Sequence, residues 1–268
     1  RSFIHHQNPG PDLEVSDSSI TMTVDADLID IRPIILGAVV RNVNLEKLNI
    51  ESDEFIKSLM DHQEKLHFAL GRGRKRASIG VHDLSTLHPP FRVKAVSGNE
   101  KFVPLAMEEP MSINEILVNH PKGVEYAHLL EGYDKFPVII DSEDNILSFP
   151  PIINGKHTTV TETTTDFFID VTGWDFRSCE ASLMLIALQL SELGGSIESI
   201  EITDCHGQVN KFPNGSPVEH VLPRKLLDGL LGRELSDSEL TKSINRMGGS
   251  FVSRKSEQVI INMPRWRF

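Results

Sequence analysis

Polar side chains gather around two strand patterns in residues 147–175, LSFPPIINGKHTTVTETTTDFFIDVTGWD. Pro150 and Pro151 end the first pattern, because proline cannot donate to a strand ladder and favours extended backbone before it. Nine residues within 158–172 are Thr or Asp, too many hydroxyls and carboxylates for a core. Strand ends that present polar side chains often form a pocket. The pattern alone, however, favours a Thr-rich edge strand with solvated side chains.

His82 and Asp83 follow a predicted strand at residues 77–81 and could act as an acid–base or hydrogen-bonding pair. Adjacent residues on a strand point to opposite faces, so the two line one pocket only where the strand has ended. A structural histidine is the favoured interpretation for either residue alone.

Four cations lie within the six residues 71–76, GRGRKR, which is the one basic cluster in an acidic chain. Arg72, Arg74, Lys75 and Arg76 are suited to a phosphate backbone. They are equally suited to a solvated segment after the C-terminus of a helix, where positive charge interacts favourably with the helix dipole. The sequence leaves both interpretations open.

Composition excludes several classes of protein. The 268 residues carry a formal net charge of −11, which argues against a surface that wraps nucleic acid, and we expect no DNA partner. The longest apolar run, residues 183–188, is far too short for a membrane span, and no signal peptide is visible. Two cysteines fit a reducing cytosol. The HExxH, CxxC, GxxxxGK[ST] and GxSxG motifs are absent, so no metal site is predicted. The chain begins without Met, and we expect an excised fragment.

Alternating strand and helix patterns predict a mixed-sheet α+β domain over residues 1–207, with helices packed on the sheet. Helical periodicity runs to about residue 70, and Ser112 and Glu115 form a capping box that opens a short helix. An apolar helix is predicted at 179–193. The expected strands are 20–24, 34–43, 77–81, 91–96, 136–141, 145–149, 167–171 and 197–202.

A composition break at residues 206–217, HGQVNKFPNGSP, separates a small second unit, which we place at 208–268. A helix is predicted at 223–231, and a capping box of Ser236 and Glu239 opens another. A hairpin of residues 251–252 and 259–263 follows. Two helices and a two-stranded wing predict a winged-helix-like domain with no chemistry of its own.

Several long blocks resemble the archaeal and eukaryotic cytosolic type of phenylalanyl-tRNA synthetase β subunit. They are residues 147–155, LSFPPIING, and 167–175, FFIDVTGWD, together with the blocks at 31–43, 65–91 and 136–148. The small unit, which ends in INMPRWR, is similar to the winged-helix-like domain of that family. The resemblance covers nearly the whole chain. It implies an editing domain followed by the next module, without the catalytic-like domain of the subunit.

In that family the large domain hydrolyses tyrosine wrongly attached to the phenylalanine tRNA. A pocket built for a phenyl ring rejects a ring with one added hydroxyl only weakly. A site built to bind that hydroxyl strongly rejects the analogue that lacks it. The resemblance therefore implies polar groups at the end of an aromatic-sized pocket. Asp170 and Thr172 share one strand face. Asp170 and Ser148 are expected to meet the tyrosine hydroxyl, Thr172 to shape the pocket, and Ile139 to form a wall.

The resemblance also implies roles in catalysis and in tRNA binding. Asn154 is expected to orient the ester or the attacking water. His82 lies within a sequence block that resembles the family, and it is a second catalytic candidate. The basic cluster is expected to contact tRNA. Trp174 departs from the family pattern, in which a small polar residue is frequent at the pocket rim.

The fragment is expected to need no cofactor, whereas the whole enzyme uses ATP and magnesium. The implied partners are the 3′ end of tRNA(Phe) and the synthetase α subunit, in a cytoplasmic assembly of two α and two β subunits. Two rival hypotheses are a non-catalytic tRNA-binding or scaffolding piece of the synthetase, and an editing domain that has lost activity.

Overall fold

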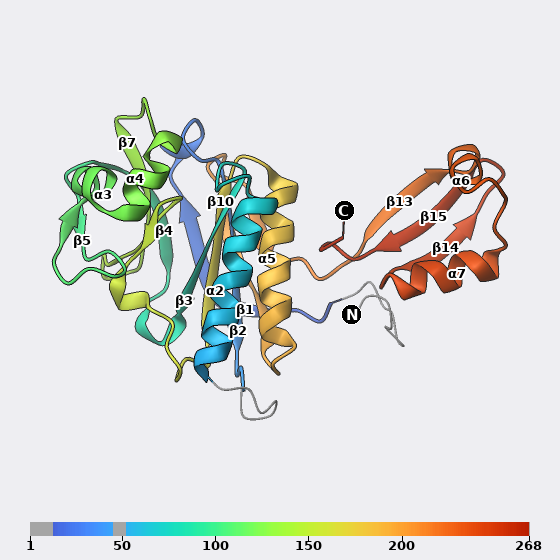
Figure 1. The fold of residues 1–268 in the computed structure, drawn as a ribbon, viewed down its shortest axis with the longest axis horizontal. Coiled ribbons are helices and arrows are strands. Elements are labelled where there is room, and N and C mark those ends of the chain that lie inside the picture. The colour runs from blue at the N-terminus through green and yellow to red at the C-terminus, as the bar shows by residue number, and fades with distance from the viewer. Residues whose placement is uncertain (1–12, 45–51, 268) are drawn as a thin grey trace. The chain divides into compact units, whose positions relative to one another are not determined.

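The computed structural model describes residues 13–44 and 52–267 (Figure 1). The chain forms two compact units, of which the larger is Val15–Asn214 and the smaller contains Gly215–Phe268. The boundary lies beyond the predicted position after residue 207. The reason is that β12 (Val209–Phe212) pairs with β11 (Ser196–Thr203) and so extends the sheet of the larger unit.

The larger unit is built on a ten-stranded sheet. Besides β11 and β12, its strands are β1 (Ser16–Val24), β2 (Ile34–Arg41), β3 (Ala77–Asp83), β4 (Phe91–Ser97), β7 (Lys135–Ile140), β8 (Ile146–Phe149), β9 (Ile153–Asn154) and β10 (Phe167–Gly173). They follow the order β3-β10-β2-β11-β1-β4-β7-β8-β9, with β12 on β11. Strand β1 pairs in parallel with β11 and β4, and the other described pairs are antiparallel. The predicted mixed sheet is therefore confirmed.

Two long helices cover one face of this sheet, α2 (Ser52–Ala69) and α5 (Phe176–Ser191), and they lie side by side in Figure 1. Asp175 caps α5, because its carboxylate accepts a hydrogen bond from the Ser178 N–H at 2.8 Å. Every residue of β10 is buried, and most of β2 is too. Burial along nearly the whole length is expected for strands covered on both faces.

Shorter elements complete the larger unit. The capping box predicted at Ser112 and Glu115 is confirmed at the start of α3 (Ile113–Asn119). Helix α4 (Pro121–Tyr126) follows α3 directly. The remaining elements are β5 (Lys101–Phe102), β6 (Met111–Ser112) and the 3-10 helices η1 (Ala26–Leu28), η3 (Leu84–Thr86), η4 (Ala127–Leu129) and η5 (Lys156–Thr158).

The smaller unit contains the two predicted helices, α6 (Arg224–Leu231) and α7 (Asp237–Arg246). The capping box of Ser236 and Glu239 opens α7, as predicted. The predicted two-stranded wing is wrong in one respect. Strand β13 (Val218–Pro223) pairs with β15 (Gln258–Met263), which also pairs with β14 (Ser250–Arg254), so the sheet has three strands. Within residues 13–44 and 52–267, no helix has both the length and the apolar character needed to cross a membrane.

Candidate active site

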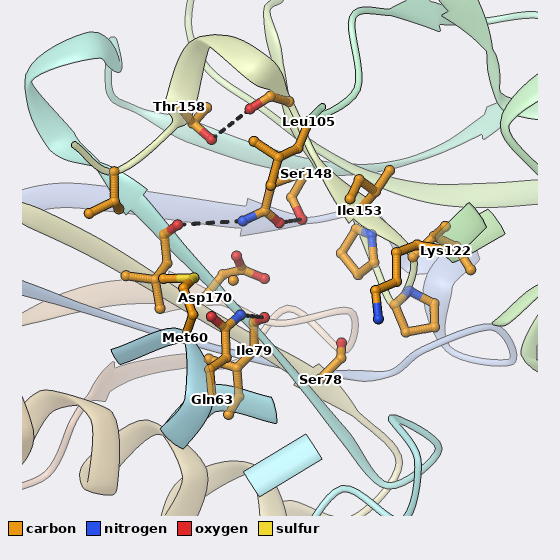
Figure 2. A pocket seen from close by; sticks show the side chains of 18 of the residues that line it. Met60, Gln63, Ser78, Ile79, Leu105, Lys122, Ser148, Ile153, Thr158 and Asp170 are labelled. Carbon is orange, nitrogen blue, oxygen red and sulfur yellow. Dashed lines mark hydrogen bonds between the residues drawn. The ribbon is translucent and has the colours of Figure 1, made fainter. Parts of the chain in front are cut away.

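A pocket of about 320 Å³ lies where β3, β8, β9 and β10 come together beside α2 (Figure 2). Polar groups from all four strands reach it, and the side chains that line it include Asp170 of β10, Ser148 of β8 and Asn154 of β9. Figure 2 shows the Asp170 carboxylate between Met60 and Gln63 on one side and Ser148 on the other. Apolar walls with a few converging polar groups are typical of a small-molecule site.

Asp170 is the buried carboxylate of this pocket, with 1% of its surface exposed. It lies directly opposite Gly80 in the β3–β10 pairing. A Cβ atom at position 80 would lie 1.9 Å from Asp170 Oδ2, so glycine is needed there to make room for the carboxylate. Asp170 Oδ2 is 2.7 Å from His82 Nε2. Among the described residues, no hydrogen bond is formed by Asp170 Oδ1, and this oxygen is available to a ligand.

His82 is fully buried and does not line the pocket. Its Nδ1 atom lies 2.8 Å from the hydroxyl of Thr158, which does line the pocket. The Thr158 hydroxyl is also 3.0 Å from the Gly155 carbonyl oxygen. A hydroxyl has one proton to donate, so donation to Gly155 requires an N–H at His82 Nδ1, whereas donation to Nδ1 requires a bare nitrogen. The chain of contacts Asp170–His82–Thr158 therefore orients the Thr158 hydroxyl at the pocket wall.

Ser148 and Asn154 face each other in the β8–β9 pairing. The Ser148 hydroxyl donates to Asn154 Oδ1 at 3.3 Å, and Asn154 Nδ2 donates to the Val81 carbonyl at 3.4 Å. Both distances are long for hydrogen bonds. The Asn154 amide and the Ser148 hydroxyl can therefore turn toward a ligand at little cost.

Two residues predicted to shape the pocket do not line it. Thr172 is fully buried, and its hydroxyl accepts a hydrogen bond from Arg32 Nε at 2.6 Å and lies 3.0 Å from Ser78 Oγ. The Arg32 guanidinium thus occupies the space next to Thr172. Ile139 is directly opposite Ser148 in the β7–β8 pairing, but it is fully buried in the hydrophobic core.

The basic cluster divides into one buried and three exposed cations. Arg74 is 7% exposed, and its guanidinium donates to the carbonyl oxygens of Pro151 and Ile152 at 3.1 and 2.9 Å. It also pairs with Glu64 at 2.8 Å. Arg74 therefore holds the loop after the proline pair at the pocket rim, which differs from the predicted role of a phosphate contact. The exposed side chains are those of Arg72, Lys75 and Arg76.

Burial changes the ionisation of several groups near the pocket. It lowers the pKa of Arg32 to about 10, so this guanidinium stays charged at neutral pH. His67 and then Arg74 hold the pKa of Glu64 at about 2, against the opposing effect of burial. Burial also lowers the pKa of His67, whose Nε2 accepts the Ile79 N–H at 2.8 Å. Burial raises the pKa of Cys179 to about 12, consistent with a free structural thiol.

The sequence did not identify Thr158, Arg32 or Gly80 as parts of the site. The only local signals were the Thr-rich run and a glycine inside the buried strand ASIGVHD. Across the described part of the chain, no group of three His, Cys, Asp or Glu side chains is placed to hold a metal ion.

Known proteins share the fold of this chain. The B3/4 domain family matches residues 32–188, which include every strand that contributes to the pocket. A solved N-terminal fragment of the phenylalanyl-tRNA synthetase β subunit from Pyrococcus horikoshii superimposes with a TM-score of 0.88 at 33% identity. This match covers 99% of this chain and 75% of that one.

Curated relatives agree with the structural match. The phenylalanine–tRNA ligase β subunit of Methanosarcina acetivorans is 40% identical over 267 residues, and that of Methanosarcina barkeri is 42% identical over 267 residues. Each alignment covers 100% of this chain and 48% of the relative, so the chain spans about half the length of these relatives.

The pocket thus lies in a B3/4 domain. With the smaller unit included, the chain belongs to the phenylalanyl-tRNA synthetase β-subunit family, as the sequence blocks predicted.

Proposed function

We propose that the larger unit hydrolyses the aminoacyl ester of Tyr-tRNA(Phe) and is the editing domain of a phenylalanine–tRNA ligase β subunit. One observation carries this proposal. The Asp170 carboxylate is buried in the pocket, with Oδ2 bound to His82 and Oδ1 available to a ligand. A phenol hydroxyl is a donor of the right kind for this oxygen.

Selectivity for tyrosine follows from the cost of leaving a buried carboxylate without a partner. Tyrosine donates its phenol proton to Asp170, with Ser148 nearby as a second polar contact. Phenylalanine fills the same apolar volume but leaves Asp170 Oδ1 desolvated and unpaired. A site that binds a hydroxyl in this way rejects the analogue without it far more strongly than an apolar pocket rejects an added hydroxyl.

The ester is hydrolysed when water adds to its carbonyl carbon and loses a proton to solvent, and the ribose oxygen of the terminal adenosine takes up a proton and leaves. Asn154 Nδ2, held only weakly by the Val81 carbonyl, can donate to the carbonyl oxygen as negative charge develops there. Thr158 presents its hydroxyl at the pocket wall, and His82 and Asp170 fix that hydroxyl from behind. His82 is accordingly a positioning residue that acts through Thr158.

The family also suggests the setting of this reaction. We propose that the complete β subunit assembles with an α subunit as two copies of each, in the cytoplasm, and supports aminoacylation of tRNA(Phe). The ATP and magnesium of that reaction are proposed to bind outside this chain. The substrate of the pocket is the acylated 3′ end of tRNA(Phe).

The test is release of labelled amino acid from Tyr-tRNA and Phe-tRNA by the purified chain. Tyrosine is expected to be released well above the rate in buffer, and phenylalanine much more slowly. Asp134→Ala removes an exposed carboxylate outside the pocket and should change neither rate. If the chain binds tRNA but does not accelerate release of tyrosine, the non-catalytic tRNA-binding interpretation replaces this one.

A further inference from the structure

A second cavity, of about 830 Å³, has the buried Arg32 in its wall. Cations and aromatic rings supply most of its lining: Arg32, Arg72, Lys75, Arg76, Tyr133 and Trp174. We call it the basic groove. His128 also lines it.

Charge makes the groove unusual for this protein. The whole chain has a formal net charge of −11. The groove nevertheless exposes three cations, Arg72, Lys75 and Arg76. They form no ion pair with another described residue. Asp175 lies near Arg76, but its carboxylate is bound to Ser178 at the start of α5. A local positive groove on an acidic protein attracts a polyanion.

Trp174 places an aromatic ring among these cations. Its side chain is 47% exposed, and its backbone N–H donates to the Arg76 carbonyl at 3.0 Å. The ring is therefore anchored next to the cationic loop and not carried on a loose segment. Exposed rings beside cations are how proteins bind single-stranded nucleic acid, because every base has a face that can stack.

The basic groove and the pocket share a wall. Arg32 lines the groove, Ser78 lines the pocket, and the Arg32 guanidinium donates to Ser78 Oγ at 3.0 Å. Strand β10 also connects the two, because Asp170 lies in the pocket and Trp174 directly follows the strand. Asp170 and Trp174 are four residues apart, which corresponds to ~13 Å along an extended strand. A single strand of about four stacked nucleotides, at ~3.4 Å per step, covers the same length.

We propose that the basic groove binds the single-stranded 3′ segment of tRNA, with Trp174 stacked on a base and Arg72, Lys75 and Arg76 on phosphates. This inference rests on the proposed function, since the segment is the one whose terminal ester enters the pocket. It assigns a role to Trp174 and leaves the buried Arg74 out of the nucleic-acid surface.

The experiment measures binding of a short, unacylated, single-stranded RNA that ends in CCA. Trp174→Ala is expected to weaken binding by about 5- to 150-fold, the range for loss of one stacked base. Trp174→Phe should recover part of the loss. The matched control is Phe68→Ala, which removes an aromatic ring that is 82% exposed and outside the groove, and it should leave binding unchanged.

Salt dependence tests the cations separately. Replacing Arg72, Lys75 or Arg76 by Ala should reduce the slope of log affinity against log salt by about 0.7 for each phosphate that the variant no longer neutralises. Lys57→Ala, on the exposed side of α2, is the control that should keep the slope. Melting curves establish that each variant is folded.

The outcomes separate this inference from the proposed function. Unchanged affinity in Trp174→Ala, or an unchanged salt slope in all three cation variants, overturns the groove proposal even if the chain releases tyrosine from Tyr-tRNA. Conversely, normal RNA binding without tyrosine release contradicts the hydrolytic function and leaves the groove in place. A duplex RNA of equal length that competes as well as the single strand also overturns the proposal, because bases in a duplex cannot stack on Trp174.

Discussion

Replacing Asp170 with Ala should remove the preference of the pocket for tyrosine. Only Oδ1 of this carboxylate is available to a ligand, because His82 Nε2 lies 2.7 Å from Oδ2. The tyrosine hydroxyl therefore gains one hydrogen bond to a charged group, worth about 1.5–3 kcal/mol. Its loss corresponds to a decrease of about 10- to 150-fold in the ratio of kcat/KM for Tyr-tRNA over Phe-tRNA. The rate on Tyr-tRNA should carry most of this decrease.

The same substitution also affects the fold, and the assay must separate the two effects. Without Asp170, the buried His82 ring loses its acceptor, at a cost of about 1–3 kcal/mol. For a domain of this size, each 1 kcal/mol lowers Tm by about 2–4 °C. Rates should therefore be measured well below the melting transition of the variant, which calorimetry defines.

His82→Gln is the matched control, because it breaks the same buried pair but keeps the carboxylate in the pocket. We expect it to slow Tyr-tRNA and Phe-tRNA by similar factors, with the preference retained. Equal losses on the two substrates in Asp170→Ala would refute the recognition role and make Asp170 a group that acts on the reaction itself. No loss on either substrate would remove Asp170 from the site.

Three further predictions concern neighbouring side chains. Asn154→Ala should slow Tyr-tRNA hydrolysis with little change in Tm, because its side-chain bonds are long; a large fall in Tm would instead make it a structural turn residue. Thr158→Ala should lower kcat on both substrates, and Thr158→Ser should restore it, since only the hydroxyl meets His82 and the pocket; a Ser variant as slow as Ala would refute this. Burial lowers the pKa of His67 in the folded chain, so below pH ~6.5 the unfolded chain binds a proton that the folded chain does not. The free energy of unfolding should therefore fall as the pH falls, by at most about 1.4 kcal/mol per pH unit. Urea titrations from pH 7 to 5 should show a shallower fall in His67→Gln, and equal slopes would contradict the assignment.

The sequence was informative where local pattern decides the structure. Apolar alternation located the main strands, and the two capping boxes located helix starts, because both signals depend on residues close in the chain. The strand patterns of the sequence led to Ser148, Asn154 and Asp170, and the structure brings them to one pocket. Their expected roles remain predictions.

The sequence was uninformative where a distant side chain decides the environment. Alternation placed Thr172 on the same face as Asp170, but Arg32 approaches from 140 residues earlier and covers it. Arg74 has the sequence context of an exposed loop, yet it turns inward to the carbonyl oxygens of Pro151 and Ile152.

Two further differences between the sequence-based expectation and the structure also arise from residues that are distant in the chain. His82 pairs across the sheet with Asp170, whereas its neighbour Asp83 accepts hydrogen bonds from Ser85 and Thr164. In the smaller unit, β13 ends in Pro223 and alternates between half-buried and exposed residues. It therefore lacked the apolar signal of a strand, although it pairs along β15.

A crystal structure of this chain with a hydrolysis-resistant amide analogue of 3′-tyrosyl adenosine would show directly whether the pocket binds tyrosine through Asp170. We expect the phenol oxygen within hydrogen-bonding distance of Asp170 Oδ1, at about 2.5–3.0 Å. We also expect the amide carbonyl near Asn154 Nδ2 and the Thr158 hydroxyl, with the adenosine leading toward Arg32. A tyrosyl group bound outside this pocket, or bound within it with its phenol oxygen away from Asp170, would contradict the proposed mode of recognition.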